Sequence, residues 1–146
     1  MALDLNDKTS NGNNLTNNGA TEWLTDFPFA TSTIAAKLVA ASFQYFSMVT
    51  STSLKPTGNF TIECWIKLTS IDINQFIFAS WSNQSSIYSG ILLDIEPGNT
   101  VRIVSSKNTG QILGTDWQKH DSTTALSVDT WYHIALVFDN TANTVA

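Results

Sequence analysis

Apolar and polar residues alternate with a period of two along the segment 59–69. This is the pattern of a β-strand with one face in a core and one face outside it. The apolar set is Phe60, Ile62, Cys64, Ile66 and Leu68, and the opposite set is Thr61, Glu63, Trp65 and Lys67. The pattern therefore predicts a strand at the surface of a packed sheet.

Short β-branched and aromatic runs recur along the chain between clusters of Asn, Gly, Ser, Thr and Pro, which indicates an all-β fold. The segment 32–43, STIAAKLVAASF, is rich in helix formers but is interpreted as strand because its neighbours pair more naturally with strands. Residues 75–81 and 131–139 are apolar at both parities, so we expect these strands to be covered on both faces. The predicted strands are Ala20–Thr25, Ala35–Ala41, Phe43–Thr50, Asn59–Thr69, Gln75–Ser82, Ser89–Ile95, Thr100–Ser106 and Trp131–Asp139.

Composition and charge narrow the class of protein. The 146 residues fit a single domain, 1–146, and only 13% of them are charged, against about 25% in a typical domain. A net charge of −5 argues against a nucleic-acid partner. One cysteine, Cys64, allows neither an internal disulfide nor a cysteine-based zinc site. No signal peptide and no apolar run long enough to cross a bilayer is visible.

Four segments carry a resemblance to a known family. They are DKTSNGNNLTNNGA (7–20), SFQYFSM (42–48), SLKPTGNFTIECWIKLTS (53–70) and DTWYHIALVFDNTANTV (129–145). In this order they resemble the hallmark segments of laminin-G-like domains in the concanavalin A-like lectin and glucanase superfamily. The resemblance implies a jelly-roll β-sandwich of two antiparallel sheets. Ser10 stands where the opening loop of the family usually has Gly.

The resemblance also implies strands beyond residue 146. Family members continue past the NTVA segment with strands that close the sandwich. Because an uncovered sheet edge is a pairing hazard, we expect a partner chain, a swapped strand or an assembly neighbour to cover it.

Catalysis is not expected from these residues. Retaining glucanases of the superfamily carry an E-x-D-x-E strand, because retention needs two carboxyls about 5–5.5 Å apart. The nearest match is LLDIE, in which Asp94 and Glu96 fit and Leu92 occupies the nucleophile position. The pair is more simply explained as a solvated strand end before a turn, and the protein is not expected to be an enzyme.

A structural calcium ion is one candidate ligand. Asp4, Asp7, Asn11 and Asn13 place hard oxygen donors in a tight loop, and calcium takes six to eight such ligands. The resemblance implies a calcium ion near this loop, usually with a further ligand from the C-terminal segment. The alternative is an Asn/Gly turn stabilised by its own bonds between side chains and backbone.

A glycan or another surface is the second candidate ligand. Sugars stack their C–H faces on aromatic rings, while amides and carboxylates bind their hydroxyls. The candidate set is Trp81, Asn83, Tyr88, Asp116, Trp117 and Gln118. Trp117 is the residue most expected to be exposed, whereas Trp81 fits packing at the edge of a core. Glu63, Trp65, Lys67, Trp131 and His133 are expected to form one outer scaffold face rather than a site.

Two functions therefore remain open. The first is a non-catalytic binding or adhesion module that recognises a glycan or a protein surface. The alternative is a structural or decoration subunit of an extracellular surface, filament or virus particle, assembled through an open sheet edge. Both functions predict an extracellular, cell-surface or virion-exposed location and no insertion into a membrane. Both are also compatible with a homo-oligomer or a larger assembly.

Overall fold

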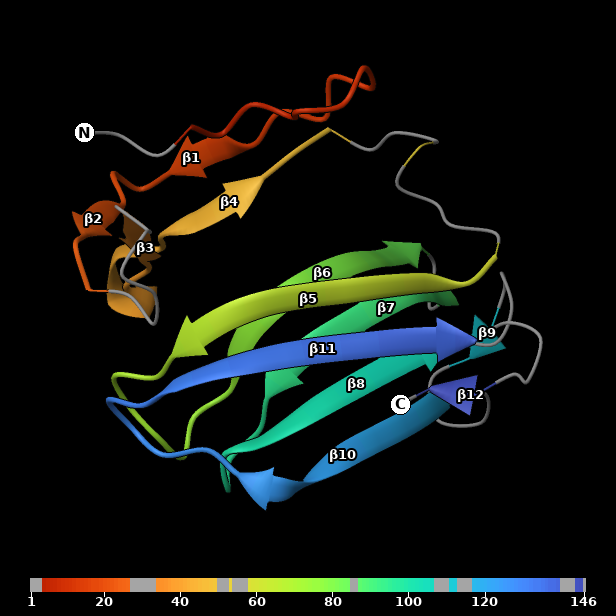
Figure 1. Cartoon of the computed structure of the whole chain (residues 1–146). Helices are drawn as coiled ribbons and strands as arrows, with labels where there is room; N and C mark the ends of the chain where they lie inside the picture. The colour runs from red at the N-terminus through yellow and green to blue at the C-terminus, as the bar shows by residue number, and fades with distance from the viewer. Residues whose placement is uncertain are drawn as a thin grey trace. The chain divides into compact units, whose positions relative to one another are not determined.

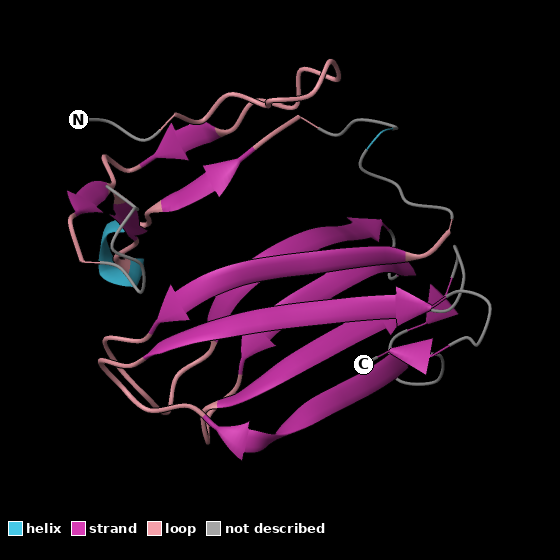
Figure 2. Ribbon diagram, viewed as in Figure 1, coloured by secondary structure: helices cyan, strands magenta, loops and turns pink. Residues whose placement is uncertain are grey.

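The computed structural model describes residues 4–26, 34–49, 53, 58–84, 87–106, 111–112, 117–139 and 144–145. The chain divides into two compact units, one of residues 1–60 with 139–142 and one of residues 61–138 with 143–146. The described regular structure is almost entirely strand, as predicted for an all-β fold (Figure 2). Whether the two units make one domain over residues 1–146 stays a prediction.

The larger unit is a pair of antiparallel sheets (Figure 1). The first sheet has the order β10-β8-β7-β6, with β9 also paired to β7, and the second has the order β12-β11-β5. The strands are β5 (Phe60–Lys67), β6 (Gln75–Gln84), β7 (Ile87–Ile95), β8 (Thr100–Ser106), β9 (Gln111–Ile112), β10 (Trp117–Ala125), β11 (Trp131–Asp139) and β12 (Thr144–Val145).

The core lies between these two sheets. Leu93 and Ile103 from the five-stranded sheet are packed with Leu136 from β11, and Ile62 and Ile134 lie against them. A neighbouring cluster contains Leu68, Ile95 and Leu126. The expected core set of β5 is confirmed, because Phe60, Ile62, Cys64, Ile66 and Leu68 are each buried or half-buried.

The expectation that β11 and β6 are covered on both faces is wrong for the described side chains. His133, Ala135 and Val137 of β11 are exposed, so this strand buries one face. In β6 a bulge between Phe76 and Phe78 shifts the pairing with β7 by one residue. Two successive residues, Ile77 and Phe78, then lie against the core. The apolar residues at both parities of β6 therefore reflect the bulge, which changes the parity that faces the core. They do not indicate that both faces of the strand are buried.

A tight hairpin joins β7 and β8. The amide of Asn99 donates to the carbonyl of Glu96 at 2.8 Å, and the amide of Glu96 donates to the carbonyl of Thr100 at 3.1 Å. Gly98 and Asn99 have positive φ angles of 97° and 63°, which Gly and Asn adopt with the least strain. This turn fixes the register of β7 and β8, the two central strands of the five-stranded sheet, with Ile95 opposite Val101.

The smaller unit contains two short antiparallel pairs. β1 (Thr16–Asn18) pairs with β4 (Tyr45–Ser47), and β2 (Glu22–Leu24) pairs with β3 (Ala35–Lys37). The sequence between β3 and β4 forms a 3-10 turn, Ala40–Ser42, which ends at Phe43 with a φ of 49°. A side chain at Gly19 would meet the carbonyl oxygens of Ser42 and Phe43 at 3.0 Å, so this position requires glycine.

Each of the eight predicted strands overlaps an observed strand. The expected strand Ala35–Ala41 is wrong in its second half, where the chain enters the 3-10 turn instead. The sequence did not predict β10, which is polar through its centre, nor the short strands β1, β9 and β12.

Leu93→Ala tests the position of the core. Leu93 is 1% exposed between the sheets, so we expect this truncation to lower the free energy of unfolding by about 3 kcal/mol. Val137→Ala is the matched control, since Val137 is 46% exposed on the neighbouring strand, and should cost less than about 1 kcal/mol. Urea titration followed by tryptophan fluorescence measures both. Equal losses for the two variants would contradict this assignment of the core.

Candidate functional site

One face of the five-stranded sheet carries the candidate site, and register alone defines it. Residues opposite one another in antiparallel strands belong to the same face. The row that continues through the four long strands is Asp121, Arg102, Asp94 and Phe76, and the next row on this face is Lys119, Val104, Leu92 and Ala79. We call this surface, opposite the face of Leu93 and Ile103, the Asp94 face.

A cluster of charges lies on the Asp94 face. The Nε of Arg102 donates to Oδ1 of Asp94 at 2.8 Å, and its two terminal nitrogens donate to Asp94 and Glu96. Lys119 extends the cluster, because its Nζ lies 3.0 Å from Glu96 and 3.3 Å from Asp121. Three carboxylates and two cations are thus linked across strands β7, β8 and β10.

Burial makes the Asp94–Arg102 pair the tightest part of this cluster. Asp94 is 0% exposed, and the side chain of Arg102 is 19% exposed. The bonds that Arg102 donates to Asp94 raise the pKa of its guanidinium above the ordinary value, and the bond that Lys119 donates to Glu96 raises the pKa of Lys119. The interpretation of Asp94 and Glu96 as a solvated strand end is therefore wrong, because Asp94 is a buried ion-pair partner.

These contacts bear on whether Asp94 and Glu96 could act as catalytic carboxylates. Leu92 and Asp94 lie on one face of β7, and Glu96, just past the end of this strand, shares Arg102 with Asp94. Leu92 carries no carboxylate, and both acidic residues are bonded to Arg102. Their geometry suits fixed hydrogen-bonding charges better than a nucleophile and an acid that change protonation during a reaction.

The predicted glycan residues are divided by the register. Gln118, Ser105, Ile91 and Ser80 form one row on the core side of the five-stranded sheet. Trp117 and Trp81 each lie one residue from this row, on strands at opposite edges, and so both belong to the Asp94 face. Asn83 is paired with Tyr88 two positions beyond Trp81 and also belongs to that face.

The register thus assigns four of the six predicted residues to one face, with Trp117 on one edge strand and Trp81 and Asn83 on the other. Trp81, Asn83, Tyr88 and Trp117 are at one end of the Asp94 face, and the charge cluster occupies the rest of it. Gln118 belongs to the opposite face. Asp116 lies outside the described residues.

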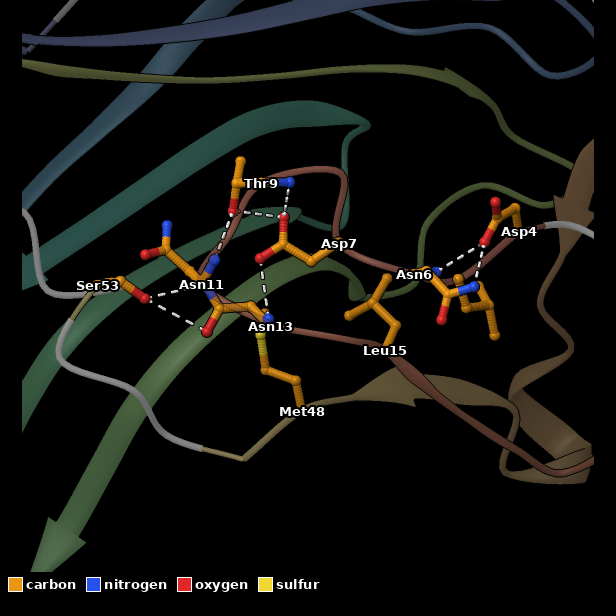
Figure 3. A pocket seen from close by; sticks show the side chains of 10 residues that line it. Asp4, Asn6, Asp7, Thr9, Asn11, Asn13, Leu15, Met48 and Ser53 are labelled. Carbon is orange, nitrogen blue, oxygen red and sulfur yellow. Dashed lines mark hydrogen bonds between the residues drawn. The ribbon is translucent and has the colours of Figure 1, made fainter.

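The predicted calcium loop forms a separate, open depression in the smaller unit (Figure 3). It has a volume of about 490 Å³. Asp4, Asp7, Asn11 and Asn13 all line it, so the structure does bring the predicted ligands together. The hydroxyl of Ser53 lies beside Asn13, whose Nδ2 donates to it at 2.9 Å.

The carboxylates of this loop already have hydrogen-bond donors. Oδ1 of Asp7 accepts bonds from the amide and the hydroxyl of Thr9, both at 2.7 Å, and Oδ2 accepts one from the amide of Asn13 at 2.9 Å. These bonds lower the pKa of Asp7, those from Thr9 most. Asp4 is bonded to Asn6 and Lys8 in the same way, which lowers its pKa to about 2.

Calcium at this loop remains a prediction. A metal ion would have to compete with the donors of Thr9 and Asn13 for Asp7 and with Lys8 for Asp4. Across the residues that the structure describes, no three His, Cys, Asp or Glu side chains are grouped as metal ligands. The contacts match the alternative prediction, a turn held by its own side chains.

The outer face of the three-stranded sheet is built as expected from the sequence. His133 lies 3.5 Å from Glu63 through Nε2, and its ring packs on Trp65 with a centroid separation of 5.1 Å. Lys67 lies over the ring of Trp131 at 5.7 Å. Glu63, Trp65 and Lys67 are thus paired with side chains of β11, which supports their interpretation as a scaffold face.

Sequence reasoning did not single out Arg102, Lys119 and Asp121. A signal for Arg102 was present: the turn at Pro97-Gly98 places Asp94 opposite Arg102 in any hairpin centred on Gly98. Lys119 and Asp121 had no comparable signal, because their strand was not predicted.

Comparison with known proteins agrees with this architecture. A laminin-G-like family model, described as the concanavalin A-like lectin/glucanases superfamily, matches residues 41–146. The chain belongs to this superfamily. Its predicted fold, a concanavalin A-like sandwich of antiparallel sheets, is confirmed. No curated protein and no solved structure gave a significant match.

Membership in this superfamily indicates the general class of function of the chain. Laminin-G-like domains are generally non-catalytic binding modules. The absence of catalysis in this chain stays a prediction. The match begins at residue 41, so it includes the Asp94 face but not the loop of Asp4 and Asp7. Among the described residues, no helix is long and apolar enough to span a bilayer.

Arg102→Met tests the buried ion pair. It leaves the carboxylate of Asp94 buried without its partner, so we expect a loss of about 3 kcal/mol in the free energy of unfolding. The double variant Asp94→Leu with Arg102→Leu removes both charges and should recover most of this loss. Chemical denaturation measures both variants. A double variant less stable than Arg102→Met would contradict the inference that the unpaired charge is the cost.

Asp7→Ala tests the loop. Because Asp7 accepts three bonds within its own turn, we expect a lower melting temperature at pH 7. The pKa of Asp7 is lowered in the folded state, so its contribution is present above the ordinary value of 3.8 and is lost as the pH falls through the folded pKa. The difference between the wild type and the variant should therefore shrink below about pH 4.

Calorimetric scans in EDTA and in calcium chloride separate the two accounts of this loop. A self-bonded turn gives the same difference between Asp7→Ala and the wild type in both solutions. A difference that appears only with calcium would show that the ion, rather than the turn, makes Asp7 stabilising.

Proposed function

We propose that this domain binds glycans on the Asp94 face of its five-stranded sheet. The observation that carries the proposal is the register of strands β6, β7, β8 and β10. It assigns positions 81, 88 and 117, which are far apart in sequence, to the same end of the face that carries the charge cluster, and this supports the proposal.

The chemistry of these residue types fits a sugar. Aromatic rings offer flat apolar surfaces for the C–H faces of pyranose rings, and Asn83 adds an amide for hydroxyl groups. Arg102, Glu96 and Lys119 hold one another in place, so these polar groups are ordered before a ligand arrives. Preordered groups lose less conformational entropy on binding.

Charge favours a neutral glycan over an acidic one. The cluster has three carboxylates, Asp94, Glu96 and Asp121, against the two cations Arg102 and Lys119. The whole chain has a net charge of −5. A uronate or sulfate group would approach a surface of its own sign, which slows association and weakens binding.

The proposed location is extracellular, on a cell surface or a particle. Membership in a family of typically extracellular binding modules and a surface rich in Ser, Thr and Asn support this location. The alternative function, a structural or decoration subunit, predicts instead that sugars do not bind and that association between chains governs behaviour.

Trp117→Ala tests glycan binding. We expect the wild type to bind members of an array of neutral oligosaccharides, and the variant to bind them roughly tenfold more weakly or worse, because truncating an aromatic anchor costs on the order of 2 kcal/mol. Trp65→Ala is the matched control, since Trp65 is 42% exposed on the other sheet and should leave binding unchanged.

Circular dichroism of both variants checks that they are folded. Retention of full binding by a folded Trp117→Ala protein would remove this face as the site. Absence of binding to every neutral and acidic sugar on the array would favour the structural alternative.

A further inference from the structure

We propose that Asn11 is a modification site, at which the side-chain amide is lost by spontaneous deamidation. The inference concerns the loop of Asp4 and Asp7 in the smaller unit and does not depend on the binding of a glycan. It rests on the residue that follows Asn11 and on the contacts of these two neighbours. Because the reacting atoms belong to adjacent residues, the reaction is decided within this loop.

Deamidation begins with an attack on asparagine, one of the thermolabile residues, by the residue that follows it. The main-chain nitrogen of that residue gives its proton to water or hydroxide and bonds to Cγ of the asparagine. The bond from Cγ to Nδ2 breaks, and Nδ2 takes a proton from water and leaves as ammonia. A five-membered succinimide ring remains.

Water then opens the succinimide in one of two ways. If the new bond between nitrogen and Cγ breaks, the product is aspartate. If the original peptide bond breaks, the product is isoaspartate, in which the main chain runs through Cγ. In both cases one water is consumed and one ammonia is released, so no other reactant is needed.

The chain contains two pairs in which this attack is least hindered by the second residue. Glycine has no side chain to obstruct the approach, and its backbone rotates most freely. The two pairs are Asn11-Gly12 and Asn18-Gly19. Because they have the same two residues, any difference between their rates in the folded protein reports on structure.

The Asn11-Gly12 pair can reach the reactive geometry. Asn11 is exposed, and its side-chain amide makes no hydrogen bond with the residues that the structure describes (Figure 3). Its main-chain amide donates to the hydroxyl of Thr9 at 3.2 Å, which leaves the side chain free to rotate. A Cβ added at Gly12 would meet nothing within 4 Å, so the space around this residue is open.

The Asn18-Gly19 pair is held in place. Nδ2 of Asn18 donates to the hydroxyl of Ser47 at 2.9 Å and to the carbonyl of Thr16 at 3.1 Å, and the residue is half-buried in β1. Rotation of Cγ toward the nitrogen of Gly19 would break these bonds. Opening two hydrogen bonds should make the reaction at Asn18 at least about tenfold slower than at Asn11.

Conversion of Asn11 changes the loop in two ways. Either product adds a carboxylate to the depression that Asp4 and Asp7 line, and so adds one negative charge to the net charge of −5. Isoaspartate also lengthens the main chain by one carbon. The bond from the amide of Asn13 to Asp7 spans residue 11, so we expect the isoaspartate form to lose it.

The experiment incubates the folded wild type in mildly alkaline buffer and follows both pairs by peptide mapping with mass spectrometry. Deamidation should accumulate at Asn11 at least about tenfold faster than at Asn18. In concentrated guanidinium chloride the two pairs should react at similar rates, because the structure that separates them is gone. Asn11→Gln is the matched control. Its side chain is too long to form the five-membered ring, so reaction at position 11 should stop while that at Asn18 is unchanged.

Hydrogen exchange tests the consequence for the loop. The amide of Asn13 should exchange faster in the isoaspartate fraction than in the fresh wild type. Freshly prepared Asn11→Asp has the added charge and a main chain of normal length, so its exchange should match that of the wild type. Equal exchange in all three proteins would contradict the loss of the bond to Asp7.

Two results would overturn the assignment of Asn11. The first is a folded protein in which Asn11 reacts no faster than Asn18. The second is a rate at Asn11 that is at least about tenfold slower in the folded chain than in the unfolded one, which would show that the fold holds this side chain as well.

Discussion

The packing of Leu93 and Ile103 against Leu136 is the contact on which the other features of the larger unit depend. These residues come from β7, β8 and β11, and each is less than a tenth exposed. Once they are buried, the period of two in each strand assigns every neighbouring residue to a face. The core therefore decides which residues share the opposite side of the five-stranded sheet, including those whose chemistry is of functional interest.

A buried ion pair on that opposite side adds specificity to this arrangement. Asp94 has no exposed surface and relies on Arg102, which is directly opposite it across the β7–β8 hairpin. A slip of the hairpin by one residue would move Arg102 to the core face and leave the carboxylate without its partner. Such a slip would be costly, so the pair opposes alternative registers as well as holding charges in place.

Much of the fold was readable from the sequence, for physical reasons. The alternation of apolar and polar residues in Phe60–Leu68 predicted which face of this strand is buried. The apolar runs in β7, β8 and β11 are longer than those found in turns, so they predicted strands. β10 was missed because its centre is Lys-His-Asp, which has low strand propensity, and only pairing with β8 makes it extended. β1 has the residues Thr-Asn-Asn and is likewise a strand only through its partner β4.

The candidate site was less accessible to sequence reasoning than the fold. Glycan residues were proposed from their type and from their expected places at strand ends or in loops, and Trp117, Tyr88 and Asn83 lie near the ends of strands β10, β7 and β6. Which of them share a face depends on register across four strands, and register involves contacts between residues distant in sequence. The Asp4–Asn13 loop was easier, because short-range bonds between Asp7, Thr9 and Asn13 are encoded within a few residues.

The bulge in β6 has a consequence for the aromatic end of the Asp94 face. Pairing begins with Gln75 opposite Ile95 and Phe76 opposite Asp94, and it resumes with Phe78 opposite Leu93. Without the extra residue, Trp81 would meet Ser89 instead of Gly90 and would belong to the core face. A single inserted residue thus exchanges the faces on which the later residues of β6 lie. It lets one continuous strand place Phe76 on the Asp94 face, Phe78 against the core, and position 81 back in register with the Asp94 face.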